Sequence, residues 1–162
     1  VVSERFGWML VWGDYAFVPF CYCVVGYYLP DRAEPLSVLA INGEADPLIP
    51  IQGGECCKRG DGGRLLSTNE SLGFFLRKNG CSDSPAREAL PARVDDGTTV
   101  ERSTYPACAH QTDVVWYLVH GMGHGWPPKP PQAKRMTGPT SQNIDATQVI
   151  WEFIKQHQKP TG

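Results

Sequence analysis

Two short, almost entirely apolar runs constrain the fold of this chain more than any other feature. The first covers residues 36–41 (LSVLAI) and ends at Asn42-Gly43, and the second covers residues 114–119 (VVWYLV) and leads into a glycine-rich segment. Runs of this length that are bounded by turn residues are typical of strands buried on both faces, the kind found inside a parallel sheet. We therefore expect a mostly parallel sheet that contains both runs.

The stretch between the two runs contains a helix signal. Residues 67–70 (STNE) match the capping box, in which an N-cap serine and a glutamate three residues later satisfy each other's backbone N–H groups. The apolar residues Leu72, Phe75 and Leu76 then fall on one helical face, and Gly80 is a favourable C-terminal stop. The pattern predicts a helix between residues 67 and 80.

A second helix is expected at the end of the chain. Asp145 can act as its N-cap with Gln148 as capping-box partner, and Ile144 can pack onto Val149 as a hydrophobic staple. The apolar stripe of this helix consists of Val149, Ile150, Phe153 and Ile154, flanked by Trp151. Strands that alternate with helices indicate an α/β fold.

The connecting segments are expected to be irregular. Residues 82–97 are rich in Pro, Ser and Asp and read as a loop, and the turn at 95–97 is expected to lead into an edge strand near residues 98–100. Residues 127–143 contain many prolines and little periodicity, which predicts a long surface loop.

The composition indicates a single packed domain over residues 1–162. The chain has 15 basic and 17 acidic side chains and a net charge of −2, so it lacks the basic footprint of a nucleic-acid-binding protein. Residues 8–28 are mostly apolar and are long enough to span a bilayer, but Asp14, Pro19 and two glycines interrupt them. We expect one or two buried strands there rather than a membrane span.

The six cysteines favour an oxidising compartment, because a cytosolic protein of this size rarely has so many. No Cys-x-x-Cys motif is present, and the spacings at Cys21, Cys23, Cys56 and Cys57 do not match those of zinc sites. We therefore expect disulfides rather than a metal, although cysteine positions alone do not determine the pairing.

Two residues with catalytic potential directly follow the predicted strands. Asp46 lies in the segment after residues 36–41, and His124 lies in the segment after residues 114–119. Functional side chains of α/β sheets sit at the carboxyl ends of the strands, and an acid that precedes the histidine is the order found in α/β-hydrolases. Ordinary turns also contain Asp-Pro and glycine-flanked histidines, and His110, His120 and His157 are weaker candidates.

Several motifs in matching order resemble one family. They are Asn42-Gly-x-x-Asp46-Pro-x-x-Pro50, Asn79-Gly80-Cys81, Tyr105-Pro-Ala-Cys108, Gly123-His124-x-Trp126-Pro127 and Ile144-Asp145-Ala-Thr-x-x-Ile150-Trp151-x-Phe153. Over residues 30–157 the chain resembles the C-terminal half of secreted polyhydroxybutyrate depolymerases and of feruloyl or acetylxylan esterase-like proteins.

The resemblance implies an α/β-hydrolase fold, an extracellular location, and hydrolysis of a polyester or plant cell-wall ester without metal or cofactor. It also implies that Asp46 and His124 are the acid and base of a Ser–His–Asp triad. Trp126 is expected to line the substrate pocket beside the histidine, although a packing role is an equal alternative. The resemblance favours a disulfide between Cys81 and Cys108, with two free buried thiols as the alternative.

The chain departs from the family at several points. The family usually has Thr or Ser at the position of Glu44, and Thr or Asn at the position of Gly125. Residues 1–28 match the family poorly. The sequence contains no Gly-x-Ser-x-Gly nucleophile elbow. We therefore expect the C-terminal part of a serine carboxylesterase that lacks the first strands and is inactive alone. The alternative is a non-catalytic binding module or pseudoenzyme on the same scaffold.

Overall fold

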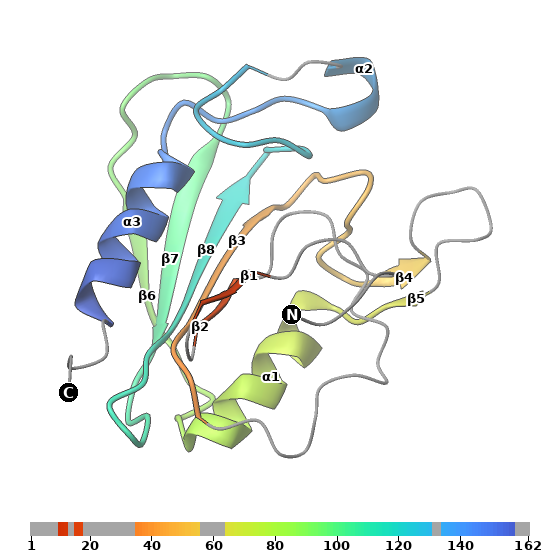
Figure 1. Ribbon diagram of the computed structural model, residues 1–162. Coiled ribbons are helices and arrows are strands. Elements are labelled where there is room, and N and C mark those ends of the chain that lie inside the picture. Colours follow the sequence, from red (N-terminus) through yellow and green to blue (C-terminus); the bar gives the residue numbers. More distant parts are fainter. Residues whose placement is uncertain (1–9, 13–14, 18–34, 56–63, 131–133, 158–162) are drawn as a thin grey trace.

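A computed structural model describes residues 10–12, 15–17, 35–55, 64–130 and 134–157. Its centre is a four-stranded sheet in the order β3-β8-β7-β6 (Figure 1). The strands are β3 (Val38–Gly43), β6 (Ala86–Leu90), β7 (Thr99–Tyr105) and β8 (Val114–His120). β3 and β8 pair in parallel, whereas β8 with β7 and β7 with β6 pair antiparallel.

The two strands predicted from the apolar runs are confirmed, with small shifts at their ends. The expectation of a mostly parallel sheet is wrong for this four-stranded sheet, since only one of its three strand pairs is parallel. The physical reason is the connection length: β6, β7 and β8 follow one another through short links, and short links can join only antiparallel neighbours.

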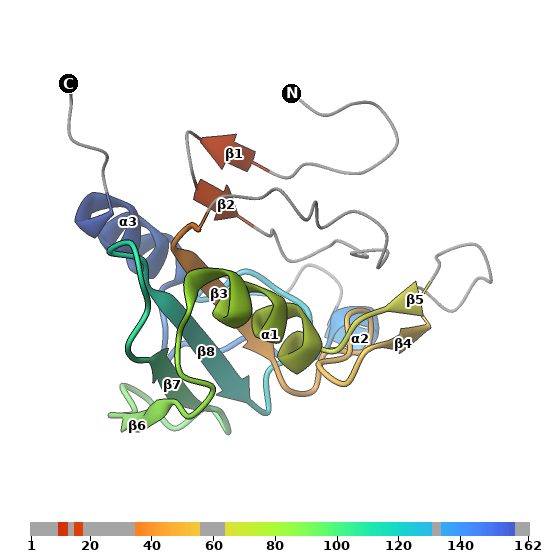
Figure 2. The same cartoon turned by 90° about the horizontal axis from the view of Figure 1, so that it is seen from below.

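Helices α1 (Thr68–Asn79) and α3 (Ala146–Gln156) cover opposite faces of the sheet (Figures 1 and 2). The capping box of α1 is present in full, and Gly80 ends the helix with a left-handed φ of 64°. In α3 the Asp145 side chain accepts from the backbone N–H of Gln148, as predicted. The Gln148 side chain instead bonds to Glu152, so the second half of the predicted box is not formed.

The core consists of two clusters, one on each face of the sheet. The α3 side contains Leu39, Ile41, Val100, Val119, Met122, Ile144, Ala146 and Phe153. The α1 side contains Val38, Leu72, Leu76, Tyr105, Val114 and Trp116. Successive residues of β3 therefore enter different clusters, which is why its sequence is apolar throughout instead of alternating.

Two predicted loops are corrected by the structure. Residues 82–97 contain strand β6, whose side chains are mostly exposed, so its pairing with β7 depends on backbone hydrogen bonds and left no apolar pattern in the sequence. As a result β7 is an inner strand and not the predicted edge strand. Residues 127–143 contain the short helix α2 (Lys134–Thr137) and the buried residues Ser141 and Asn143, so this segment is not simply a surface loop.

Smaller elements complete the described residues. β1 (Leu10–Trp12) pairs antiparallel with β2 (Tyr15–Phe17), which agrees with the strands expected within residues 8–28. Residues 8–9, 13–14 and 18–28 lie outside the described part. β4 (Gly54–Glu55) pairs with β5 (Arg64–Leu65). No helix within the described ranges has the length and apolar character needed to cross a membrane.

A disulfide joins Cys81, just after α1, to Cys108, between β7 and β8. The two Cα atoms are 3.9 Å apart. The bond joins the end of α1 to the link between β7 and β8, and both cysteines pack against the core cluster on the α1 side of the sheet. Cys21, Cys23, Cys56 and Cys57 lie outside the described residues.

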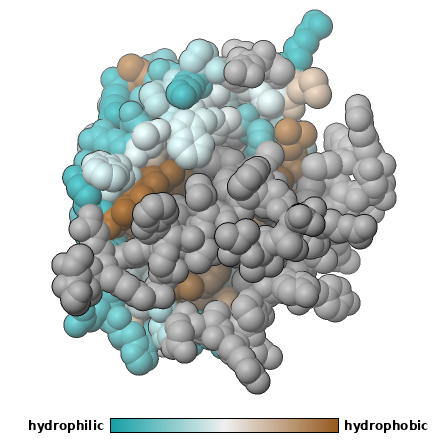
Figure 3. All heavy atoms as spheres, in the orientation of Figure 1, coloured by the Kyte–Doolittle hydropathy of each residue, from teal (hydrophilic) through white to brown (hydrophobic). Residues whose placement is uncertain are grey.

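On the face shown in Figure 3 the described surface is mostly hydrophilic or neutral, and apolar residues form a few separate groups. Among the described residues the exposed large hydrophobic side chains are Val94, Trp126, Met136 and Trp151.

Candidate active site

The parallel register of β3 and β8 brings two loops together at one edge of the sheet. Gly43, the last residue of β3, lies opposite Val119 of β8, so both chains leave the sheet at the same level. The pairing continues into the loops, where the N–H of Glu44 donates to Val119 O (3.0 Å) and that of Ala45 to Met122 O (2.9 Å). Residues that follow the two strands are therefore held side by side.

Asp46 is fixed in the loop after β3 by its own turn. Its Oδ1 accepts from the backbone N–H groups of Leu48 (2.8 Å) and Ile49 (2.9 Å), an arrangement that Asp-Pro sequences favour. The residue is only 7% exposed. Because Oδ1 is occupied by the backbone, Oδ2 is the oxygen that faces the loop after β8.

His124 completes the contact. Its Nδ1 lies 2.9 Å from Asp46 Oδ2, and the two side chains are 15% and 4% exposed. The pKa of His124 is raised above its ordinary value because the ring donates a hydrogen bond to Asp46. Partial burial opposes this increase, and the negative charge of Asp46 adds to it. The structure thus brings together the two residues that the sequence singled out as acid and base.

Glycines allow the backbones around His124 to approach closely. A Cβ atom on Gly43 would lie 2.5 Å from Met122 O and nearer still to Gly123 O. A Cβ atom on Gly123 would lie 2.8 Å from Gly138 Cα and nearer still to Thr137 O. Three backbone segments therefore stack on one another without intervening side chains, which places His124 within reach of Asp46.

The arrangement is suited to proton transfer. With Nδ1 donating to a buried carboxylate, the neutral ring accepts a proton at Nε2, and the carboxylate stabilises the imidazolium that forms.

The other histidines differ from His124 in their surroundings. His120 Nδ1 lies 3.2 Å from Glu44 Oε2, but both side chains are well exposed. His157 Nε2 lies 2.7 Å from Asp113 Oδ2, and its Nδ1 contacts the carbonyl of Phe153, so it ties the end of α3 to the start of β8. His110 is exposed in a loop. Of these histidines, only His124 faces a buried carboxylate.

Trp126 lies two residues after His124 and is 38% exposed. Its Nε1 donates to Thr147 Oγ1 at 2.9 Å, which anchors the ring to the first turn of α3. An anchored, partly exposed ring is compatible both with packing and with contact to a ligand.

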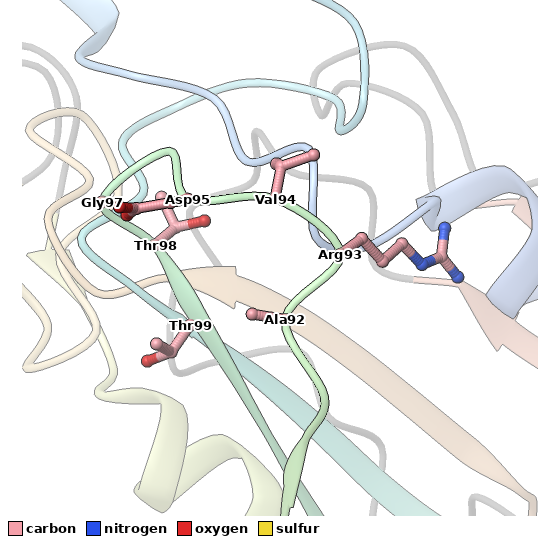
Figure 4. Close-up of a pocket in the computed structure, with 7 residues that line it drawn as sticks. All are labelled: Ala92, Arg93, Val94, Asp95, Gly97, Thr98 and Thr99. Atoms are coloured by element: carbon pink, nitrogen blue, oxygen red, sulfur yellow. The ribbon is translucent and has the colours of Figure 1, made fainter.

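A hollow of about 570 Å³ lies at the loop between β6 and β7. It is lined by residues 92–95 and 97–99 and contains neither Asp46 nor His124 (Figure 4). In the described ranges no three His, Cys, Asp or Glu side chains are grouped as metal ligands.

Sequence reasoning missed the polar residues of the segment that covers His124. Ser141 and Asn143 are 0% and 4% exposed. The hydroxyl of Thr140 is buried against Gly125 and has no hydrogen-bond partner among the described residues. Isolated polar residues in a proline-rich segment produce no periodic signal, so their burial could not be predicted from the sequence.

Comparison with curated proteins gives two similarities. The chain is 30% identical over 131 residues to "Putative esterase NocK" of Nocardia uniformis subsp. tsuyamanensis, which covers 74% of this chain and 37% of the relative. It is also 55% identical over 29 residues to Delta(14)-sterol reductase of Dictyostelium discoideum. That aligned segment covers 18% of this chain and 6% of the reductase. The chain spans less than half the length of either relative. No family model and no solved structure matches. Over about three quarters of its length, therefore, this α/β chain is related to an esterase-like protein.

Proposed function

We propose that this chain provides the acid and the base of a serine carboxylesterase similar to polyhydroxybutyrate depolymerases and feruloyl esterases. The observation that carries the proposal is the 2.9 Å contact between His124 Nδ1 and the buried Oδ2 of Asp46, at the shared carboxyl edge of β3 and β8. The similarity over 131 residues to the protein named "Putative esterase NocK" supports the same reaction class.

In the proposed reaction His124 Nε2 takes the proton of a serine hydroxyl as its Oγ attacks the ester carbonyl. His124 then gives that proton to the departing alkoxide, which leaves as the alcohol, and an acyl-serine remains. Water attacks the acyl group with His124 again as base, and the carboxylic acid and free serine are formed. Asp46 keeps the ring oriented and stabilises the imidazolium in both halves of the reaction.

The nucleophilic serine is assigned to a part of the protein outside these 162 residues. No Gly-x-Ser-x-Gly motif is present in the 162 residues, and the chain spans 37% of the similar esterase. We assign the serine and the oxyanion-binding N–H groups to another part of a longer polypeptide. Trp126 is assigned to the substrate pocket because its ring is partly exposed near His124. The disulfide favours a secreted enzyme.

A chimera tests the assignment. Residues 36–157 replace the matching segment of the Nocardia esterase, and hydrolysis of p-nitrophenyl acetate is measured with the His124→Ala, Asp46→Ala and His120→Ala variants. We expect the first two to lower kcat/KM at least about 1000-fold, because the members of a triad act as a unit. His120→Ala is the matched control, since His120 is the last residue of β8, four positions before His124, and also faces a carboxylate. A folded, active chimera that does not depend on His124 contradicts the proposal.

The 162-residue chain alone is expected to hydrolyse p-nitrophenyl acetate no faster than its His124→Ala variant. Turnover well above background that depends on His124 would show that the nucleophile lies within these residues.

A further inference from the structure

We infer that Asn143 is a positioning residue for His124 and that it acts through residues 137–143, called the strap below. The inference rests on the proposed function, because it concerns the orientation of the proposed base. It is based on two sets of hydrogen bonds, one at each end of the strap.

At one end Asn143 joins the strap to the loop before β7. Its Oδ1 accepts from the backbone N–H groups of Arg93 (2.7 Å) and Val94 (2.9 Å). Its Nδ2 donates to Asp96 Oδ1 and to the Thr98 carbonyl, each at 3.0 Å. Both polar atoms of a side chain that is 4% exposed are therefore satisfied by a single loop. Figure 4 shows this loop, with Arg93, Val94 and Thr98 labelled.

Neighbouring residues strengthen the same junction. Ser141 is fully buried, and its Oγ contacts Thr98 Oγ1 at 2.6 Å and accepts from Asn143 N at 3.0 Å. Asp96 Oδ2 accepts from the N–H of Gln142 at 2.6 Å. Burial tends to raise the pKa of Asp96, but hydrogen bonds from the Thr98 side chain and from the N–H groups of Gln142 and Thr98 outweigh it, so the pKa is lowered. The carboxylate thus stays charged within the network.

At the other end the strap holds the backbone of the histidine loop. His124 N donates to Thr137 O at 2.5 Å, and Gly123 N donates to Pro139 O at 2.8 Å. The missing side chain of Gly123 lets the backbone at Thr137 and Gly138 rest directly on the loop. The strap therefore holds the backbone N–H of His124 itself, through Thr137, which lies six positions before Asn143.

Loss of the Asn143 amide leaves the N–H groups of Arg93 and Val94 without their acceptor and removes the bonds from Nδ2 to the same loop. Only the bonds of Ser141 and Gln142 then hold this end of the strap, so it is less firmly fixed. A shift of the strap moves Thr137 O and hence His124 N. Because the contact between Nδ1 and Asp46 Oδ2 depends on the His124 backbone, the ring is expected to lose its alignment with the carboxylate.

NMR of the 162-residue chain tests this inference. The measurements are the pKa of the His124 ring and the downfield resonance of its Nδ1 proton, which reports the hydrogen bond to Asp46. They are made for wild type, Asn143→Ala, Ser141→Ala and Asn79→Ala. Asn79 is a matched control, because it is also a fully buried amide that bonds to backbone, here to Leu36 N and O, but on the α1 side of the sheet.

We expect Asn143→Ala to lower the His124 pKa toward that of an unpaired histidine and to abolish the downfield resonance. Ser141→Ala, which removes fewer bonds, is expected to produce a smaller change in the same direction and serves where Asn143→Ala does not fold. Asn79→Ala is expected to lower stability while both His124 signals stay at their wild-type values.

The positioning role is overturned if the His124 pKa and the Nδ1 proton resonance keep their wild-type values in both Asn143→Ala and Ser141→Ala. It is also overturned if Asn79→Ala changes these two signals as much as the strap variants do. If the wild-type protein itself shows neither the raised His124 pKa nor the downfield proton, the Asp46–His124 contact is absent in solution and the proposed function fails. The two failures are thus distinguishable.

Discussion

Replacing Gly123 by alanine is expected to lower the free energy of unfolding by about 3 kcal/mol, the upper end of the cost of overpacking a buried site. The added Cβ would lie 2.8 Å from Gly138 Cα and 3.0 Å from Thr137 C. These are backbone atoms, which cannot rotate away as a flexible side chain can. Relief therefore requires the strap to move off the histidine loop.

Gly73→Ala is the matched control, because it adds the same methyl group at a site with room. Gly73 lies inside α1, and the nearest atom to its added Cβ is the flexible Arg77 Nη1, at 3.4 Å. Alanine is favoured over glycine inside a helix by about 0.5–1 kcal/mol. We therefore expect Gly73→Ala to stabilise the protein by that amount, opposite in sign to Gly123→Ala.

Urea unfolding followed by circular dichroism measures both variants against wild type. A Gly123→Ala variant whose free energy of unfolding lies within about 0.5 kcal/mol of wild type, the range of ordinary surface substitutions, contradicts the expected displacement of the strap. The pKa of His124 in Gly123→Ala adds an independent check. A strap that has moved should lower this pKa, whereas Gly73→Ala should leave it unchanged.

Three further outcomes are expected. Thr140→Val should raise the melting temperature measured by calorimetry, because it removes a buried hydroxyl that lacks a hydrogen-bond partner among the described residues. Such an unsatisfied group lowers stability by about 1–3 kcal/mol, and a lower melting temperature in the variant contradicts the expectation. In the double variant Cys81→Ala/Cys108→Ala, the free energy of unfolding measured with denaturant should fall by about 3.5 kcal/mol, the chain-entropy value for a separation of 27 residues. An unchanged free energy of unfolding contradicts this expectation. Folding lowers the pKa of Asp96 below its ordinary value of 3.8. The ionised carboxylate should therefore stabilise the folded protein at pH values above 3.8, and this stabilisation should be lost as the pH falls through the lowered pKa. The stability advantage of wild type over Asp96→Asn should therefore be present near neutral pH and shrink in acid, and an advantage that is the same at all pH values rules this out.

Much of the local structure could be predicted from the sequence. The Ser67 capping box and Gly80 define α1 because their signals lie within one helical turn of each end. The run at residues 114–119 predicts β8 because a strand buried on both faces must be apolar at every position. Asp46 and His124 could be selected as candidates because each directly follows such a strand.

Only the tertiary structure decided how these parts meet. The exposed side chains of β6 have no apolar pattern, so this strand exists through its hydrogen bonds to β7. The distance between Asp46 and His124 follows from the parallel register of β3 and β8, which pairs residues more than 70 positions apart. The burial of Asn143 depends on Arg93, Val94, Asp96 and Thr98, roughly 45–50 positions away. Contacts between such distant residues leave no periodic trace in a single sequence, because each residue's partner is set by the path of the whole chain and not by its neighbours.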